Sequence, residues 1–193
     1  MDAIAEIRRR AGGRIKRIAL PEYKDKRVLD AVKMIEREKI AEVVFVSPET
    51  VDKRENDRYI EEFYNSRKDR GVTVEQARKT FEDPLFYAAM LTRDGKVDGF
   101  VAGAAHTTAD VCRAALYCVG VEERLMIASS SFIMAMPDNP AVPGGALIYA
   151  DCGLIPDPNP RQLACIALSA AELGQKVLDV TPRVAFLSYS TKG

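Results

Sequence analysis

The chain has 193 residues, 47% hydrophobic and 29% charged, enough for one large α/β domain or for one domain and the beginning of a second. Its 28 basic and 28 acidic residues cancel, which excludes a global positive field for nucleic acid or an acidic membrane. No stretch approaches the roughly 20 apolar residues that a membrane span needs, and the charged N-terminus lacks the apolar run of a signal peptide. We therefore expect a small ligand that is held by a few local groups.

The cysteine and histidine content bears on metal binding and redox state. The four cysteines lie among apolar residues without CxxC spacing, and the chain has a single histidine, so we expect no metal site. We interpret the thiols as reduced and buried in a cytoplasmic protein, with disulfides as the alternative. These cysteines are Cys112, Cys118, Cys152 and Cys165.

Strand-like and helix-like segments alternate along almost the whole chain. Short aliphatic runs indicate strands, and apolar residues at helical spacing behind capping residues indicate helices. The expected elements are, in chain order, a helix at 2–10, a strand at 17–21, a helix at 25–38, a strand at 43–46, a helix at 57–70, a capping box at 73–76, a helix at 84–93, a strand at 97–102, a helix at 107–119, strands at 126–136 and 146–152, a helix from 159 to about 173, and a strand at 183–189. This alternation predicts an α/β fold, a layered parallel sheet with helices on both sides.

The second half of the chain departs from this alternation. The runs 126–136 and 146–152, joined by a Pro/Gly-rich loop, predict a hairpin and hence a mixed sheet. We therefore predict a first domain at residues 1–125 and the beginning of a second at 126–193. The last strand leads into Ser190, Thr191 and Lys192, where α/β proteins often start a helix and an anion site. We expect further sequence beyond this point, which makes the two-domain arrangement a truncated one.

The clearest candidate site is the segment 103–113, directly after an expected strand. Its small residues allow a ligand to approach the backbone, and Thr107 and Thr108 place hydroxyls at a helix N-terminus, where N–H groups favour an anion. Arg113 lies further along that helix and can reach a phosphate. In the alternative interpretation, Thr107 and Asp110 only cap the helix, and Arg113 is a solvated surface residue.

Three other features have a functional and a plain structural interpretation. His106 has the ordinary pKa of a general base, but a lone histidine beside a cap is more often a hydrogen-bonded spectator. The serine run 129–131 can bind phosphate or simply form a polar strand edge. Arg67 lies at a charge-rich helix end, which by itself indicates a solvated face.

Several segments together resemble the phosphate acetyl/butyryltransferase family in order and approximate spacing. They are IALPE (18–22), VDGFVAG (97–103), GAAHTTADVCRAAL (103–116), SSSFIM (129–134), YADC (149–152) and VAFLSYSTKG (184–193). The resemblance implies an isocitrate/isopropylmalate dehydrogenase-like fold of two α/β domains, usually in a homodimer when full length. It also implies a role in acetate metabolism, acetyl transfer between acetyl phosphate and coenzyme A. The thiolate of CoA is expected to attack the carbonyl directly, with CoA as substrate and no bound cofactor or metal.

The resemblance also assigns roles to particular residues. Arg113 and Arg67 are expected to contact phosphate or CoA, and Asp151 is a weaker candidate. The pocket-lining residues are expected to be Ser129, Thr107 and Thr108, joined by Ser190, Thr191 and Lys192 from the second domain. The base that deprotonates CoA is expected beyond Gly193, so no catalytic residue is assigned in this chain.

Rival functions remain open on the sequence alone. One is a non-catalytic or regulatory use of the same fold that binds acyl-CoA or phosphate without turnover. Others are phosphate butyryltransferase activity, or a related enzyme that acts on another phosphorylated metabolite. An NAD-linked dehydrogenase is disfavoured because the sequence has no acidic metal-ligand cluster, and nucleic-acid binding is disfavoured by the neutral charge.

Overall fold

The computed structural model describes residues 3–136, 139–140, 142 and 145–187. It divides into two compact units: a sheet unit, Ala11–Gly120, and a hairpin unit, Met1–Arg10 with Val121–Gly193. The predicted domains, residues 1–125 and 126–193, stay a proposal, and the compact units differ from them in grouping the first ten residues with the later part of the chain.

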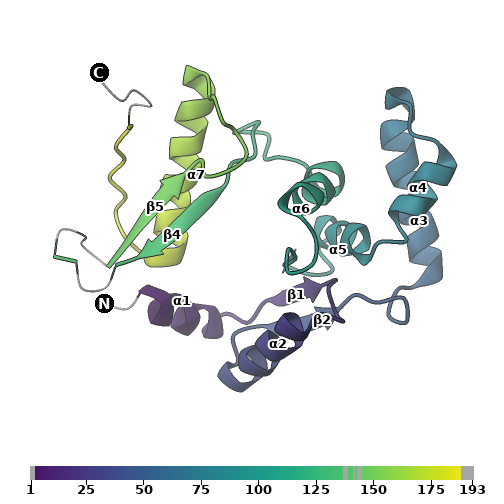
Figure 1. Ribbon diagram of the computed structural model, residues 1–193, viewed down its shortest axis with the longest axis horizontal. Coiled ribbons are helices and arrows are strands. Elements are labelled where there is room, and N and C mark those ends of the chain that lie inside the picture. The colour runs from purple at the N-terminus through teal and green to yellow at the C-terminus, as the bar shows by residue number, and fades with distance from the viewer. Residues whose placement is uncertain (1–2, 137–138, 141, 143–144, 188–193) are drawn as a thin grey trace. The chain divides into compact units, whose positions relative to one another are not determined.

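The sheet unit is an α/β structure around a parallel sheet (Figure 1). Its three strands have the order β2-β1-β3, and β1 pairs in parallel with both neighbours. The strands are β1 (Arg17–Leu20), β2 (Glu42–Phe45) and β3 (Gly99–Phe100), and the helices are α2 (Lys26–Glu38), α3 (Lys53–Arg67), α4 (Val74–Thr80), α5 (Pro84–Arg93) and α6 (Thr108–Ala114). A 3-10 turn, Lys68–Arg70, follows α3, and a π-helical turn, Ala115–Val119, follows α6. The predicted α/β fold with a parallel sheet is confirmed.

The core of the sheet unit centres on α5. Every residue from Leu85 to Leu91 is buried, so this helix is apolar on all sides, as expected for a helix that other elements surround. Asp83 begins the helix by accepting a hydrogen bond from the Leu85 N–H, and Pro84 occupies the first turn, where a missing N–H costs nothing. The start of α5 is thus fixed by its own sequence.

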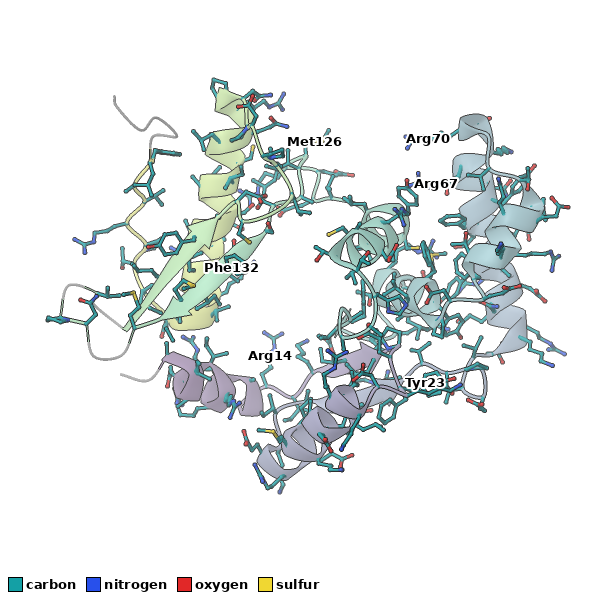
Figure 2. The ribbon with its side chains drawn as sticks, in the orientation of Figure 1. Arg14, Tyr23, Arg67, Arg70, Met126 and Phe132 are labelled. Carbon is teal, nitrogen blue, oxygen red and sulfur yellow. The ribbon has the colours of Figure 1, made fainter. Side chains whose placement is uncertain are left out.

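The hairpin unit contains β4 (Ser131–Ala135), β5 (Ala146–Ala150) and α7 (Pro160–Leu178), and α1 (Ala3–Gly12) spans the boundary between the two units. The predicted hairpin is confirmed, because β4 and β5 pair antiparallel with Phe132 opposite Tyr149. Figure 1 shows α7 along the hairpin, and a Cβ on Gly174 would lie 3.4 Å from the side chain of Ile148. Phe132, labelled in Figure 2, lies on the opposite, exposed face.

The structure differs from several predicted element boundaries. The helix predicted at 57–70 begins at Lys53 because Asp52 caps it, and the helix predicted to end near 173 continues to Leu178. The strand predicted at 183–189 is wrong for its described part, since residues 183–187 form no strand. An aliphatic run becomes a strand only when a neighbour accepts its hydrogen bonds, and the side chains of Phe186 and Leu187 are 60% and 82% exposed.

The structure also bears on the cysteines, on membrane spans and on metal binding. All four cysteines have free thiols, but Cys118 alone among them is buried. In the described part of the chain, no helix is long and apolar enough to cross a membrane. The same residues contain no group of three or more His, Cys, Asp or Glu side chains that is suited to hold a metal ion.

Candidate functional site

The turn between β3 and α6 is built around a buried carboxylate that sequence reasoning did not single out. Glu22, just after β1, has a side chain only 3% exposed. Its two oxygens accept hydrogen bonds from four successive backbone N–H groups, at 3.1 Å from Gly103, 2.8 Å from Ala104, 2.7 Å from Ala105 and 2.8 Å from His106. Four N–H groups of the turn that precedes α6 therefore already bind an internal anion.

The electrostatics of Glu22 follow from these contacts. Burial alone would raise the pKa of Glu22, but the backbone N–H groups and the His106 ring lower the pKa to about 2. Gly103 has φ +111, a conformation that favours glycine and that lets the backbone turn toward the carboxylate. Arg27, at the start of α2, donates to the Ala104 carbonyl on the same turn. The turn is held from two sides.

The predicted residues of α6 adopt the capping arrangement. The Thr107 hydroxyl accepts from the Asp110 N–H at 3.2 Å, and the Asp110 carboxylate accepts from the Thr107 N–H at 3.4 Å, which completes a capping box. The hydroxyl also donates to the same carboxylate at 2.6 Å. Arg113 donates to Asp110 at 2.8 Å, and its side chain is 50% exposed. The Thr107 hydrogen bond is the main cause of the lowered pKa of Asp110, and Arg113 adds to it. Thr108 is the first residue of the helix and is exposed.

Arg67 is not the solvated residue that its sequence neighbourhood indicates. Its guanidinium carbon lies 3.4 Å from the centroid of the Tyr117 ring and 5.9 Å from that of Phe63. Figure 2 shows Arg67 at the end of α3 on the side of α6, which leads into the turn that carries Tyr117. Its buried Nε atom has no hydrogen-bond partner among the described residues. Arg67 thus lies against the π-helical turn that directly follows α6, the helix of Arg113.

The serine run belongs to the hairpin unit, where Asp151 closes a turn. The Asp151 carboxylate accepts from the Ser130 hydroxyl at 2.7 Å and from three backbone N–H groups, those of Ser130, Gly153 and Leu154. Burial alone would raise the pKa of Asp151, but these hydrogen bonds lower the pKa to about 2. Asp151 therefore has a clear structural role. Ser129 is half-buried just before β4, and Ser190, Thr191 and Lys192 lie outside the described residues.

We expect the replacement Ser130→Ala to lower the free energy of unfolding by about 1–2 kcal/mol, because a half-buried pair of hydrogen bonds is lost. The Ser130 hydroxyl donates to Asp151 and accepts from the Cys152 N–H at 3.2 Å. Urea denaturation measures the difference. Ser169→Ala, in the middle of α7, is the control and should be neutral or slightly stabilising, since alanine is the better helix former. Equal stabilities of the two variants would contradict this role for Ser130.

Two surface hollows lie away from the predicted site residues. One, of about 510 Å³, lies over α3 and α4 and is lined by residues that include Asp57, Tyr64 and Arg78. The other, of about 350 Å³, lies beside β2 and α5, where Glu55 accepts a hydrogen bond of 2.6 Å from the Tyr87 hydroxyl. Neither hollow includes a predicted site residue, so the turn before α6 remains the best candidate site.

Comparisons with known proteins identify the family of this chain. The family model described as "Phosphate acetyl/butaryl transferase" matches residues 2–193, so the chain belongs to that family. The phosphate acetyltransferase of Clostridium acetobutylicum is 38% identical over 216 residues, covering 100% of this chain and 64% of that protein. That of Thermoanaerobacterium thermosaccharolyticum is 35% identical over 212 residues, covering 100% of this chain and 65% of that protein.

A solved structure agrees with these sequence relatives. A phosphotransacetylase from Streptococcus pyogenes superposes with a TM-score of 0.81 at 28% identity, covering 99% of this chain and 63% of that one. The predicted family is thereby confirmed. The chain spans less than two thirds of the length of the relatives it matches.

Proposed function

We propose that this chain takes part in acetyl transfer between acetyl phosphate and coenzyme A, and that the sheet unit contributes the arginines that hold the phosphate end. The observation that carries the proposal is the family match over residues 2–193, with relatives that are named phosphate acetyltransferases. The neutral net charge is consistent with a small anionic ligand that is held by local groups.

The chemistry of the proposed reaction explains the need for fixed cations. The CoA sulfur, as a thiolate, forms a bond to the acetyl carbonyl carbon, and the bond from that carbon to the phosphate oxygen breaks. Phosphate leaves with the electron pair, so negative charge grows on its oxygens. Groups that are already oriented toward such oxygens stabilise the transition state by a few kcal/mol each. Arg113 and Arg67 are the arginines proposed for this role.

The remaining candidates complete the proposed site. Thr107 and Thr108 are proposed to line the acetyl phosphate pocket beside Arg113, and Ser129 with residues 190–192 is proposed to contribute from the hairpin unit. In the observed structure Arg113 is paired with Asp110, so phosphate must compete with that carboxylate for the guanidinium. An exposed ion pair of this kind is worth at most about 1 kcal/mol, so a phosphate dianion can displace it.

The fold type and the assembly are part of the same proposal. We infer two α/β domains of the isocitrate/isopropylmalate dehydrogenase type and a homodimer, with acetate metabolism as the setting. A cytoplasmic location is supported by the free thiols of all four cysteines. CoA acts as a substrate, and no bound cofactor is proposed.

The replacement Arg113→Ala tests the phosphate contact. We expect phosphate and acetyl phosphate to bind about ten- to a hundredfold more weakly, because a charged hydrogen bond of about 1.5–3 kcal/mol is lost. Isothermal titration of each ligand into the chain measures the change. Arg9→Ala is a matched control, since Arg9 is exposed and paired with Glu6 three residues away, as Arg113 is with Asp110. Equal affinities of the two variants would remove Arg113 from the site.

Acetyl-CoA formation, followed by the thioester absorbance, separates the proposed transfer from the alternative of a non-catalytic binding module. Formation that requires both substrates and decreases in Arg113→Ala supports transfer by this chain. Binding of both substrates without any thioester would support the alternative, in which the chain binds acyl phosphate and CoA but does not join them.

A further inference from the structure

His106 lies between two carboxylates that come from different elements. Its Nδ1 is 2.8 Å from Glu22 Oε1, beside β1, and its Nε2 is 3.2 Å from Asp83 Oδ1, the N-cap of α5. The imidazole is 23% exposed, whereas the Glu22 side chain is almost fully buried. One ring therefore links the turn before α6 to the first residue of the central helix.

Both contacts are favourable in one protonation state of the ring. A neutral imidazole has one N–H donor and one bare nitrogen, and an ionised carboxylate accepts hydrogen bonds but donates none. In the neutral form, one of the two nitrogens would place its lone pair against a carboxylate oxygen. In the imidazolium form both nitrogens donate, so the observed geometry matches a protonated ring.

We propose that His106 is a positioning residue: as an imidazolium it bridges Glu22 and Asp83, and it thereby fixes the turn from which Thr107 and Thr108 begin α6. Loss of the ring proton removes one of the two ring contacts. The turn then loses its link to Asp83 of α5, or it keeps only its backbone hydrogen bonds to Glu22. The deprotonated chain therefore has a less ordered start of α6.

The charges around the ring favour the proton. Burial alone would lower the pKa of His106, but the hydrogen bond to Glu22 and the charge of Asp83 raise it above its ordinary value. Two other charged side chains near the turn are already paired. Arg27 from α2 binds the Ala104 carbonyl and Asp25, and on α6 Arg113 pairs with Asp110. Glu22 and Asp83 thus remain as the two anions that face the imidazole.

The bridge also makes the stability of the fold depend on pH. A histidine with a raised pKa in the folded state contributes stability that is fully present below its unfolded pKa of about 6.5. That contribution is lost as the pH rises through the folded pKa. The turn before α6 should therefore be best ordered in mildly acidic to neutral solution and should loosen as the pH increases.

NMR titration of the single histidine tests the bridge without any variant, because its ring gives one set of signals. We expect His106 to titrate above pH 6.5 and the amide signals of residues 103–108 to follow the same midpoint. Asp83→Asn should lower the pKa of the ring, since asparagine still caps α5 but has no charge. Asp52→Asn, the same change at the N-cap of α3, should leave the pKa unchanged. A pKa of the His106 ring at or below 6.5, or a pKa that Asp83→Asn leaves unchanged, would contradict the proposal.

The effect of the bridge on phosphate binding rests on the proposed function, and a separate experiment tests it. Phosphate affinity is measured across the titration range for the wild type and for His106→Gln, which has no titrating ring and reports the ionisation of phosphate alone. We expect the ratio of the two affinities to change with the midpoint of His106. A constant ratio would mean that the ring does not position the site. Absence of phosphate binding in both proteins would contradict the proposed function, whereas the ring titration would still decide the bridge.

Discussion

Replacement of Glu22 by alanine is expected to lower the free energy of unfolding by about 3–5 kcal/mol, the cost of removing one partner from a buried charged network. The carboxylate accepts from four backbone N–H groups and from one imidazole nitrogen, and alanine offers an acceptor to none of them. These hydrogen bonds are part-buried, and donors away from water that are left without a partner cost more than the hydrogen bonds are worth when formed. Urea denaturation of the two proteins measures the loss.

We also expect the Glu22 carboxylate to make the free energy of unfolding depend on pH in acidic solution. The pKa of Glu22 in the folded chain is about 2, below its ordinary 4.5, so its contribution is complete above pH 4.5 and is lost as the pH falls toward 2. Lowering the pKa from 4.5 to about 2 corresponds to about 3 kcal/mol of the free energy of unfolding. The stability difference between the wild type and Glu22→Gln should therefore be constant between pH 4.5 and about 6.5 and shrink below pH 4.5. It should decrease again at higher pH, where His106 loses its proton.

An exposed glutamate provides the control for both measurements. Glu61 lies on α3 with an exposed side chain, and Glu61→Ala should change the stability by less than about 0.5 kcal/mol at any pH. If Glu22→Ala were as mild as Glu61→Ala, the N–H groups of the turn would have another partner, and the account of this turn would be wrong.

Phe63→Ala is expected to destabilise the sheet unit by about 3–5 kcal/mol through loss of buried area and the cavity that remains. Phe63 is 5% exposed and makes edge contacts with Phe81 and Phe86, with ring centroids 5.5 Å and 6.0 Å away. It also lies 6.4 Å from Tyr117, the ring on which Arg67 stacks. The variant should therefore lose order around Arg67 as well as stability, which urea denaturation and the Tyr117 ring signals in NMR report.

Phe132→Ala makes the same chemical change at a ring that is 58% exposed on the hairpin. Since most of this ring already contacts water, the cost should stay below about 1 kcal/mol. Two equally small losses would contradict the role of Phe63 in stabilising the sheet unit, whereas two equally large losses would contradict the exposure of Phe132.

Local patterns were sufficient to predict most of the helices and the hairpin. Asp83 before Pro84, and Thr107 with Asp110, carry their capping information within a few residues, and both helices start as predicted. The run 183–189 shows the limit of such patterns, because a strand depends on a neighbouring strand. Residues 183–187 have apolar residues of the right kind and still form no strand.

The candidate site was harder to predict because its central contact joins distant parts of the chain. The hydrogen bonds from the turn to Glu22 connect residues 81 to 84 positions apart, and no local spacing reports them. The sequence does contain an indication of this contact. Glu22 is an acidic residue shortly after a buried strand, and the turn that contains Gly103 follows the neighbouring parallel strand at the same edge of the sheet. The charge-rich helix end around Arg67 by itself indicates a solvated side chain, because its aromatic neighbour Tyr117 comes from a later element.

Binding of acetyl phosphate to the wild-type chain is the measurement that tests the central claim most directly. In parallel isothermal titrations with acetyl phosphate and with acetate, the account predicts saturable binding of acetyl phosphate, competition by inorganic phosphate, and no comparable binding of acetate. That pattern would place recognition at the phosphate end, where Arg113 and Arg67 are proposed to act. Acetate bound as tightly as acetyl phosphate, or no saturable binding of either, would contradict it.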